Sequence, residues 1–202
     1  MTIAKGTNPN HPPQGQRTIV SPITDLGAIA AIRELLAYQP RNLCLFAVGI
    51  NTGLRIGDLL ALTVGQVQGL PPGAELSIRQ QKRGKRNTIV INEGVRLAIR
   101  TWLSNHPNPI HNAPLFPGKA PNTAITVPYA SRLVKSWCRA VGLRGNYAAH
   151  SLRKTFGYHG RVTHNQPIEV ISAALGHNDI RTTHTYLGIQ PQEVRKLFMC
   201  GL

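Results

Sequence analysis

The stretch LGHNDIRTTHTY, residues 175–186, holds the side chains from which the rest of the chain can be interpreted. It places Tyr186 nine positions after His177, in a protein with 23 Lys and Arg residues against 8 Asp and Glu. An isolated tyrosine hydroxyl has a pKa of about 10. At neutral pH it therefore attacks only when one group takes its proton and another stabilises the charge that develops.

Two upstream segments supply candidates for both tasks. In AHSLRKTF, residues 149–156, helical spacing puts His150 and Arg153 on one face, three residues apart. In NTGLRIGDLLAL, residues 51–62, Arg55 follows a glycine turn and opens a predicted helix. Two arginines, two histidines and a tyrosine form a set suited to phosphate, because the planar guanidinium binds phosphate oxygens in a bidentate way and keeps its charge.

These pieces resemble the tyrosine recombinases, the integrase family of site-specific DNA recombinases. The matching segments are TGLR at 52–55, HSLR at 150–153, LGH at 175–177 and the tyrosine at 186. Each motif alone is weak, but their order and the spacing of the last pair are specific. The resemblance extends over roughly residues 22–188, most of the chain.

The resemblance implies that DNA strands are cut and rejoined without a metal, ATP or another cofactor. It implies that Tyr186 attacks the scissile phosphate, forms a 3′-phosphotyrosyl link and releases a 5′-hydroxyl. The resemblance also implies that Arg55 and Arg153 bind the non-bridging oxygens. It implies that His150 assists the proton loss of the tyrosine and that His177 orients the phosphate. Lys82 is implied to protonate the departing 5′-oxygen.

The general acid has two candidates, because its position depends on a predicted hairpin. Residues 75–81 alternate in polarity and residues 88–91 are β-branched, which predicts two short strands joined by the basic turn KRGKRN, residues 82–87. The family carries its lysine at such a turn, just before a small residue or glycine. Lys82 matches this position best, and Lys85 is the alternative because one-residue slips in a turn are easy.

The net charge of +15 extends along the whole chain and indicates a polyanionic partner. We expect nucleic acid; a ribosomal or membrane surface is the lesser alternative, because the arginines fall inside the motifs. The resemblance implies double-stranded DNA as the partner, self-association on DNA as a dimer or tetramer synapse, and help from accessory DNA-bending proteins. Further DNA contacts are expected from Arg83, Lys85, Arg86, Lys154 and Arg181.

Three other features bear on the site and on the compartment. Asp58 lies one turn beyond Arg55, where it either holds that guanidinium or is a solvated acid favoured by the helix dipole. His159 and His164 lack cysteine or carboxylate partners nearby, so we expect surface histidines and no metal site. The three cysteines show no metal spacing; Cys44 and Cys138 are expected to be buried thiols.

The predicted compartment follows from the same features. The odd cysteine count fits a reducing cytosol, and no apolar run is long enough to span a bilayer. We therefore expect a cytoplasmic, nucleoid-associated protein that makes no membrane contact.

The predicted fold is mainly α-helical with a small antiparallel β-sheet (α+β), the tyrosine recombinase catalytic core. A flexible arm is expected over 1–21, the catalytic domain over 22–190, and a tail helix over 191–202 that packs on its own core or docks on a neighbouring subunit. The arm leaves no room for the N-terminal domain with which most members close over DNA. Apolar spacing predicts helices over 25–39, 41–51, 55–62, 93–105, 127–141, 149–162 and 167–174, with Leu26, Leu35 and Leu97 inward.

Two other functions are alternatives to recombination. A type IB topoisomerase would use the same chemistry to relax supercoils. A non-catalytic DNA-binding module would keep the fold alone, and the full set of candidate residues argues against it.

Overall fold

The computed structural model describes residues 20–80, 84, 86–177, 179–187, 195 and 198–200. The predicted arm and tail lie almost wholly outside these ranges, as do Lys82, Arg83 and Lys85. The elements are α1 (Leu26–Leu35), α2 (Pro40–Thr52), α3 (Ile56–Leu60), α4 (Val64–Val67), β1 (Glu75–Arg79), β2 (Arg86–Val90), α5 (Glu93–Leu103), α6 (Val127–Ala140), α7 (Ala149–Val162), α8 (Ile168–Ala174) and α9 (Ile180–Leu187). The predicted fold class is confirmed.

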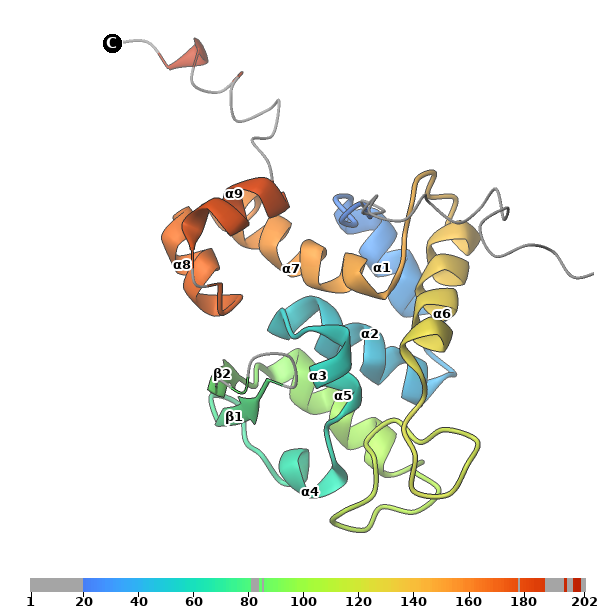
Figure 1. The fold of residues 1–202 in the computed structure, drawn as a ribbon. Coiled ribbons are helices and arrows are strands. Elements are labelled where there is room, and N and C mark those ends of the chain that lie inside the picture. The colour runs from blue at the N-terminus through green and yellow to red at the C-terminus, as the bar shows by residue number, and fades with distance from the viewer. Residues whose placement is uncertain are drawn as a thin grey trace, which may run out of the picture.

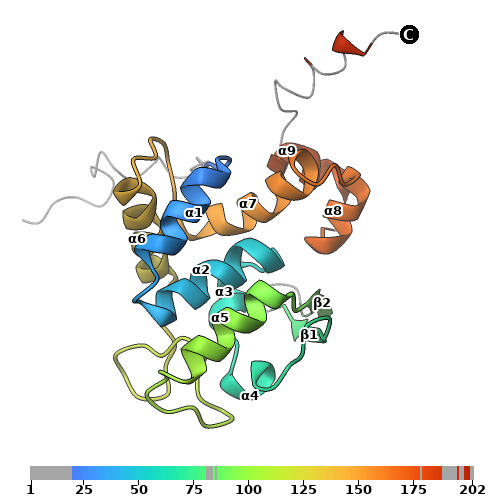
Figure 2. The ribbon, with the colours of Figure 1, turned by 180° about the vertical axis from the view of Figure 1, so that it is seen from behind.

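Helix α2 forms the centre of the core. It packs against α5 on one side and α7 on the other, with α8 and α9 beyond α7 and the hairpin beside α5 (Figures 1 and 2). Pro40 occupies its first turn, where the missing N–H costs nothing. Gly53 ends it with a φ of 62°, and a Cβ there would lie 2.6 Å from the Phe156 ring. Only glycine fits this left-handed, crowded position, which leads directly into Arg55.

The first helix buries a narrower face than predicted. Asp25 caps α1 by accepting a hydrogen bond of 2.7 Å from the Gly27 N–H. Ile29 and Ile32 are buried, but Leu26 and Leu35 are 58% and 42% exposed. The inward placement of these two leucines was wrong, because each lies about 90° around the helix from the centre of the buried face.

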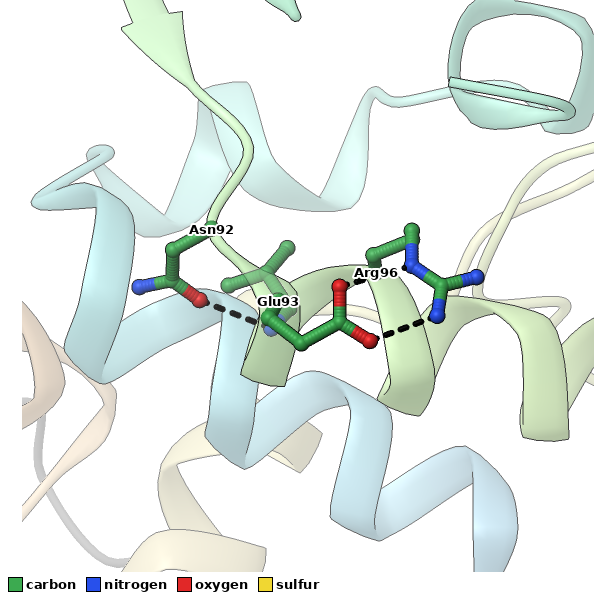
Figure 3. A network of polar contacts seen from close by, with 4 residues as sticks. Asn92, Glu93 and Arg96 are labelled. Atoms are coloured by element: carbon green, nitrogen blue, oxygen red, sulfur yellow. Dashed lines mark hydrogen bonds and ion pairs between the residues drawn. The ribbon is translucent and has the colours of Figure 1, made fainter. Parts of the chain in front are cut away.

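Helix α5 begins with a well-formed cap (Figure 3). Asn92 accepts from the Val95 N–H at 2.9 Å, and Glu93 makes two contacts with the Arg96 guanidinium, at 3.0 and 2.5 Å. Trp102 is buried, as predicted, and its indole N–H donates to the Leu115 carbonyl at 2.6 Å.

Leu97, which was expected to face inward, is 55% exposed. It lies on the opposite side of α5 from the buried residues Val95, Ala98, Ile99 and Trp102. Inward-facing apolar residues precede it at position 95 and follow it at positions 98 and 99, but the helical period turns position 97 outward.

The two strands form the predicted antiparallel hairpin. Leu76 and Ile78 face the core, and Arg79 pairs directly with Arg86. The Gly84 N–H donates to the Gln80 carbonyl at 2.8 Å, which closes the turn. The second strand begins two residues before the predicted start, because the ladder continues to Arg86.

Cys44 and Cys138 are buried, as predicted. Burial raises the pKa of the Cys138 thiol to about 12 and that of Cys44 further, so both thiols are protonated and inert at neutral pH. Across the described ranges, each helix is too short or too polar to cross a membrane.

Candidate active site

Five of the six residues assigned to the reaction lie close together, although they are far apart in the sequence. His150 and Arg153 come from the first turn of α7, and Tyr186 comes from the last turn of α9. His177 lies in the connection between α8 and α9, which pack against α7 (Figure 1). Arg55 caps the N-terminus of α3. The sixth residue, Lys82, lies outside the described part of the chain.

Arg153 connects the motif segments. Its side chain is only 2% exposed, and it donates to the Gly53 carbonyl at 2.5 Å and to the Leu175 carbonyl at 2.7 Å. Burial lowers the pKa of Arg153 to about 10, and the charge of Arg55 adds to that effect, whereas Tyr186 opposes it. The guanidinium is still charged at neutral pH. A buried positive charge fixed by carbonyl groups is therefore already in place at the centre of the site.

The ring of His177 has a defined proton. Its Nε2 lies 3.1 Å from Nη2 of Arg153, and its Nδ1 lies 2.8 Å from Oγ1 of Thr183. Arginine has no acceptor, so Nε2 must accept and carries no proton. The ring is then neutral with its proton on Nδ1, which donates to the threonine hydroxyl.

The glycine that follows α8 shapes the loop that carries His177. Gly176 has a φ of 60°, and a Cβ there would lie 2.9 Å from the Gln80 side chain at the base of the hairpin. The hairpin therefore touches the residue next to His177. Asp179 caps α9, since its side chain accepts from the Arg181 N–H at 2.9 Å.

Tyr186 lies between the two histidines. Its ring centroid is 5.3 Å from that of His150 and 5.5 Å from that of His177, and the amine of Lys154 lies 5.1 Å from it. Its hydroxyl is buried and makes no hydrogen bond with the residues that the structure describes. Burial raises the pKa of Tyr186, although the charges of Arg153 and Arg55 work in the opposite direction. Tyr186 is thus protonated without substrate, and it could attack a phosphate only with the help of a base.

His150 is suited to accept that proton. The residue is exposed overall, but its ring meets Tyr186 in a T-shaped contact, so its burial is partial. Burial, together with the charges of Arg153, Lys154 and Arg55, lowers the pKa of His150 to about 4. The fold disfavours the charged form of the ring. His150 is therefore neutral above this pKa, which includes the whole physiological range.

Arg55 and Asp58 differ in their surroundings. Arg55 is half-buried and its side chain makes no hydrogen bond with the described residues, yet its charge lowers the pKa values of His150, Arg153 and Tyr186. It therefore lies near all three.

Asp58 is only 4% exposed and raises the pKa of Arg153. The expectation of a solvated acid was wrong, because the first turn of α3 faces the core; its support of Arg55 stays a prediction.

The additional DNA-contact candidates lie on different surfaces. Arg86 is exposed in β2, and Arg181 has a side chain that is 90% exposed, 3.9 Å from Asp179. Arg79, which was not among the predicted DNA contacts, lies directly opposite Arg86 across the hairpin. Two like charges in one cross-strand pair repel, and a polyanion would relieve that repulsion. The register of the predicted hairpin could have identified Arg79 as a further candidate, because it pairs this residue with Arg86.

His159 was expected on the surface, and this was wrong. It is 9% exposed, and its ring nitrogens lie 2.9 Å from the Ile23 carbonyl and 2.7 Å from Oγ1 of Thr163. The ring fastens the segment before α1 to α7, a contact that local spacing does not reveal. His164 is exposed, as expected. The described ranges contain no cluster of three or more His, Cys, Asp or Glu side chains able to hold a metal ion.

Known proteins resemble this chain in sequence. The profile of the phage integrase family matches residues 27–193. A probable integrase/recombinase of Bacillus subtilis strain 168, YoeC, is 31% identical over 181 residues, which cover 89% of this chain and 96% of YoeC. The tyrosine recombinase XerD of Caulobacter vibrioides is 29% identical over 163 residues, which cover 78% of this chain and 52% of XerD.

Solved structures show the same fold. The XerA recombinase has a TM-score of 0.74 at 19% identity, over 91% of this chain and 66% of that one. The XerH recombinase bound to a palindromic difH substrate has a TM-score of 0.75 at 20% identity, over 91% and 53%. The chain thus spans about half to two thirds of these longer recombinases. It belongs to the phage integrase family, and its enzyme class is that of the tyrosine recombinases.

Proposed function

We propose that this chain acts on double-stranded DNA as a site-specific recombinase, with Tyr186 as its nucleophile. The observation that carries the proposal is the position of Tyr186, whose ring lies between two histidines and beside the buried Arg153. The relatives named as integrases and recombinases favour this function over DNA relaxation and over binding without cleavage.

The reaction has a balanced proton path. His150, neutral at physiological pH, takes the proton of the tyrosine as the O–P bond forms. The bond from phosphorus to the 5′-oxygen breaks, and its electron pair leaves with that oxygen, which receives a proton from Lys82. Arg55 and Arg153 stabilise the extra negative charge on the non-bridging oxygens. Since the new bond resembles the old one in energy, a different 5′-hydroxyl can reverse the step and exchange strands.

Exchange between two DNA sites requires more than one copy of the nucleophile. We therefore include in the proposal a dimer or tetramer assembled on DNA, accessory DNA-bending proteins, and a place at the nucleoid. The XerH complex with its difH substrate supports DNA as the partner.

A supercoiled plasmid carrying two copies of a candidate site distinguishes the three functions. A recombinase yields products with exchanged flanks, a topoisomerase yields relaxed circles only, and a binding module shifts the plasmid without cutting it. Sites come from mapping covalent protein–DNA adducts across the source genome. Relaxed circles without recombinants at every mapped site would contradict the proposal.

Replacing the bridging 5′-oxygen with sulfur identifies the general acid. A thiolate leaves without protonation, so Lys82→Ala should cleave a normal substrate very slowly and recover most of its rate on the sulfur substrate. Lys85→Ala should weaken DNA binding and show little recovery. If recovery follows Lys85, the predicted position of the acid in the turn is wrong; if it follows neither, the acid lies elsewhere.

DNA affinity should fall steeply as salt rises. The charge of +15 implies many phosphate contacts, and six to ten of them reduce affinity roughly a thousandfold or more between 50 and 200 mM salt. The measurement is a fluorescence anisotropy titration at several salt concentrations. Replacing Arg79 and Arg86 with Ala should reduce the slope, whereas a flat dependence in the parent protein would contradict a phosphate-dominated interface.

A further inference from the structure

Thr183 is a buried polar residue that has no role in the proposed reaction. It lies in α9, three residues before Tyr186, and its exposure is 0%. Its hydroxyl oxygen is 2.8 Å from Nδ1 of His177. Two other buried threonines, Thr52 and Thr155, donate at 2.8 Å to the carbonyl four residues earlier in their own helices. Thr183 instead directs its hydroxyl at an active-site ring.

The contact with Arg153 determines where the proton of His177 lies, and the threonine hydroxyl adapts to it. Because Arg153 can only donate to Nε2, the proton is on Nδ1 and points at the threonine hydroxyl. A phosphate oxygen is only an acceptor, so His177 can bind it through Nε2 only after Nε2 has gained a proton. In the neutral ring, Nδ1 loses its proton to water and Nε2 takes one from water, with no change in charge.

A hydroxyl is the group that allows this exchange without moving the ring. It accepts from Nδ1–H in one tautomer and donates to the bare Nδ1 in the other. We propose that Thr183 is a positioning residue that holds the plane of His177 and permits its proton to pass from Nδ1 to Nε2 when phosphate binds. This inference rests on the proposed function, because it assigns Nε2 to the substrate.

Two substitutions separate this role from simple packing. Thr183→Val keeps the shape of the side chain and removes the hydroxyl, whereas Thr183→Ser keeps the hydroxyl and removes a methyl group. A purely structural role would make the serine variant the more damaged one, because it leaves a small cavity in a fully buried position. A positioning role predicts the opposite order.

The experiment measures three quantities on the full chain. Single-turnover cleavage should fall about tenfold to a hundredfold in Thr183→Val, which is the typical loss when a functional histidine loses its hydrogen-bond partner. The rate should stay near that of the parent in Thr183→Ser. DNA affinity should be unchanged in both. Nitrogen-15 NMR of the ring without DNA should show Nδ1–H in all three proteins, because Arg153 still donates to Nε2. On an uncleavable DNA the ring should carry its proton on Nε2 in the parent and in the serine variant, and keep it on Nδ1 in the valine variant.

Thr182→Val is the matched control, because it makes the same change at the neighbouring, exposed position of α9. Its cleavage rate and its His177 spectrum should equal those of the parent. The inference is overturned if Thr183→Val keeps the parent rate, or if its ring moves the proton to Nε2 on DNA as the parent's ring does. The spectrum does not depend on cleavage. An inactive parent protein with the expected spectra would therefore count against the proposed function, not against the contact.

Discussion

Tyr186→Phe is expected to bind DNA with the parent affinity and to form no covalent protein–DNA complex. The ring keeps its contacts with both histidines, while the atom that attacks phosphorus is gone. The hydroxyl that is lost is buried and makes no hydrogen bond with the described residues, so thermal stability should not decrease. Denaturing gels of a nicked substrate that traps the covalent product measure the effect.

Tyr147→Phe and Tyr158→Phe are the matched controls. Both residues line a hollow of about 330 Å³ beside Tyr186, together with Lys154, and each change removes one hydroxyl from the same neighbourhood. Both variants should still form the adduct. A detergent-stable adduct in Tyr186→Phe would remove Tyr186 from its role, and the tyrosines at 129, 147 and 158 would become the candidates.

Arg55→Ala is expected to reduce the cleavage rate by about a hundredfold to a thousandfold, as for the removal of one donor that stabilises the transition state. Its effect on DNA affinity should be small, because Arg55 is one phosphate contact among many. The side chain of Arg55 makes no hydrogen bond with the described residues, so its removal leaves no described partner unsatisfied. Single-turnover cleavage and anisotropy on the same DNA separate the two quantities.

Arg100→Ala is the control, because it removes the same charge from an exposed position on α5. It should cleave at the parent rate. If rate and affinity fell by equal factors in Arg55→Ala, the residue would be an ordinary binding contact.

Arg153→Ala, by contrast, is a poor test of the same idea. It would leave the carbonyls of Gly53 and Leu175 without their donor in the core, which destabilises the fold by roughly 1–3 kcal/mol per group. A low rate in that variant would therefore report lost structure as well as lost transition-state stabilisation. The sequence motif treats the two arginines alike, whereas their burial separates them.

The local elements followed from the sequence because their causes are local. The turn at Gly53 and the alternation of β1 each depend on residues within a few positions. The same holds for α7, whose predicted bounds match. Errors arose where a residue lay at the margin of an apolar face, as with Leu26 and Leu35.

The sequence by itself determined the helical fold, the family and the chemical types of the site residues. Only the tertiary structure decided their burial and protonation. It buries Arg153 and Asp58, and it keeps His150 neutral and Tyr186 protonated. It also places the proton of His177 on Nδ1. These states depend on solvent exclusion and on charges and hydrogen bonds that join segments as much as 100 residues apart. Spacing along one helix fixes which side chains share a face, but it carries no information about what lies across from them.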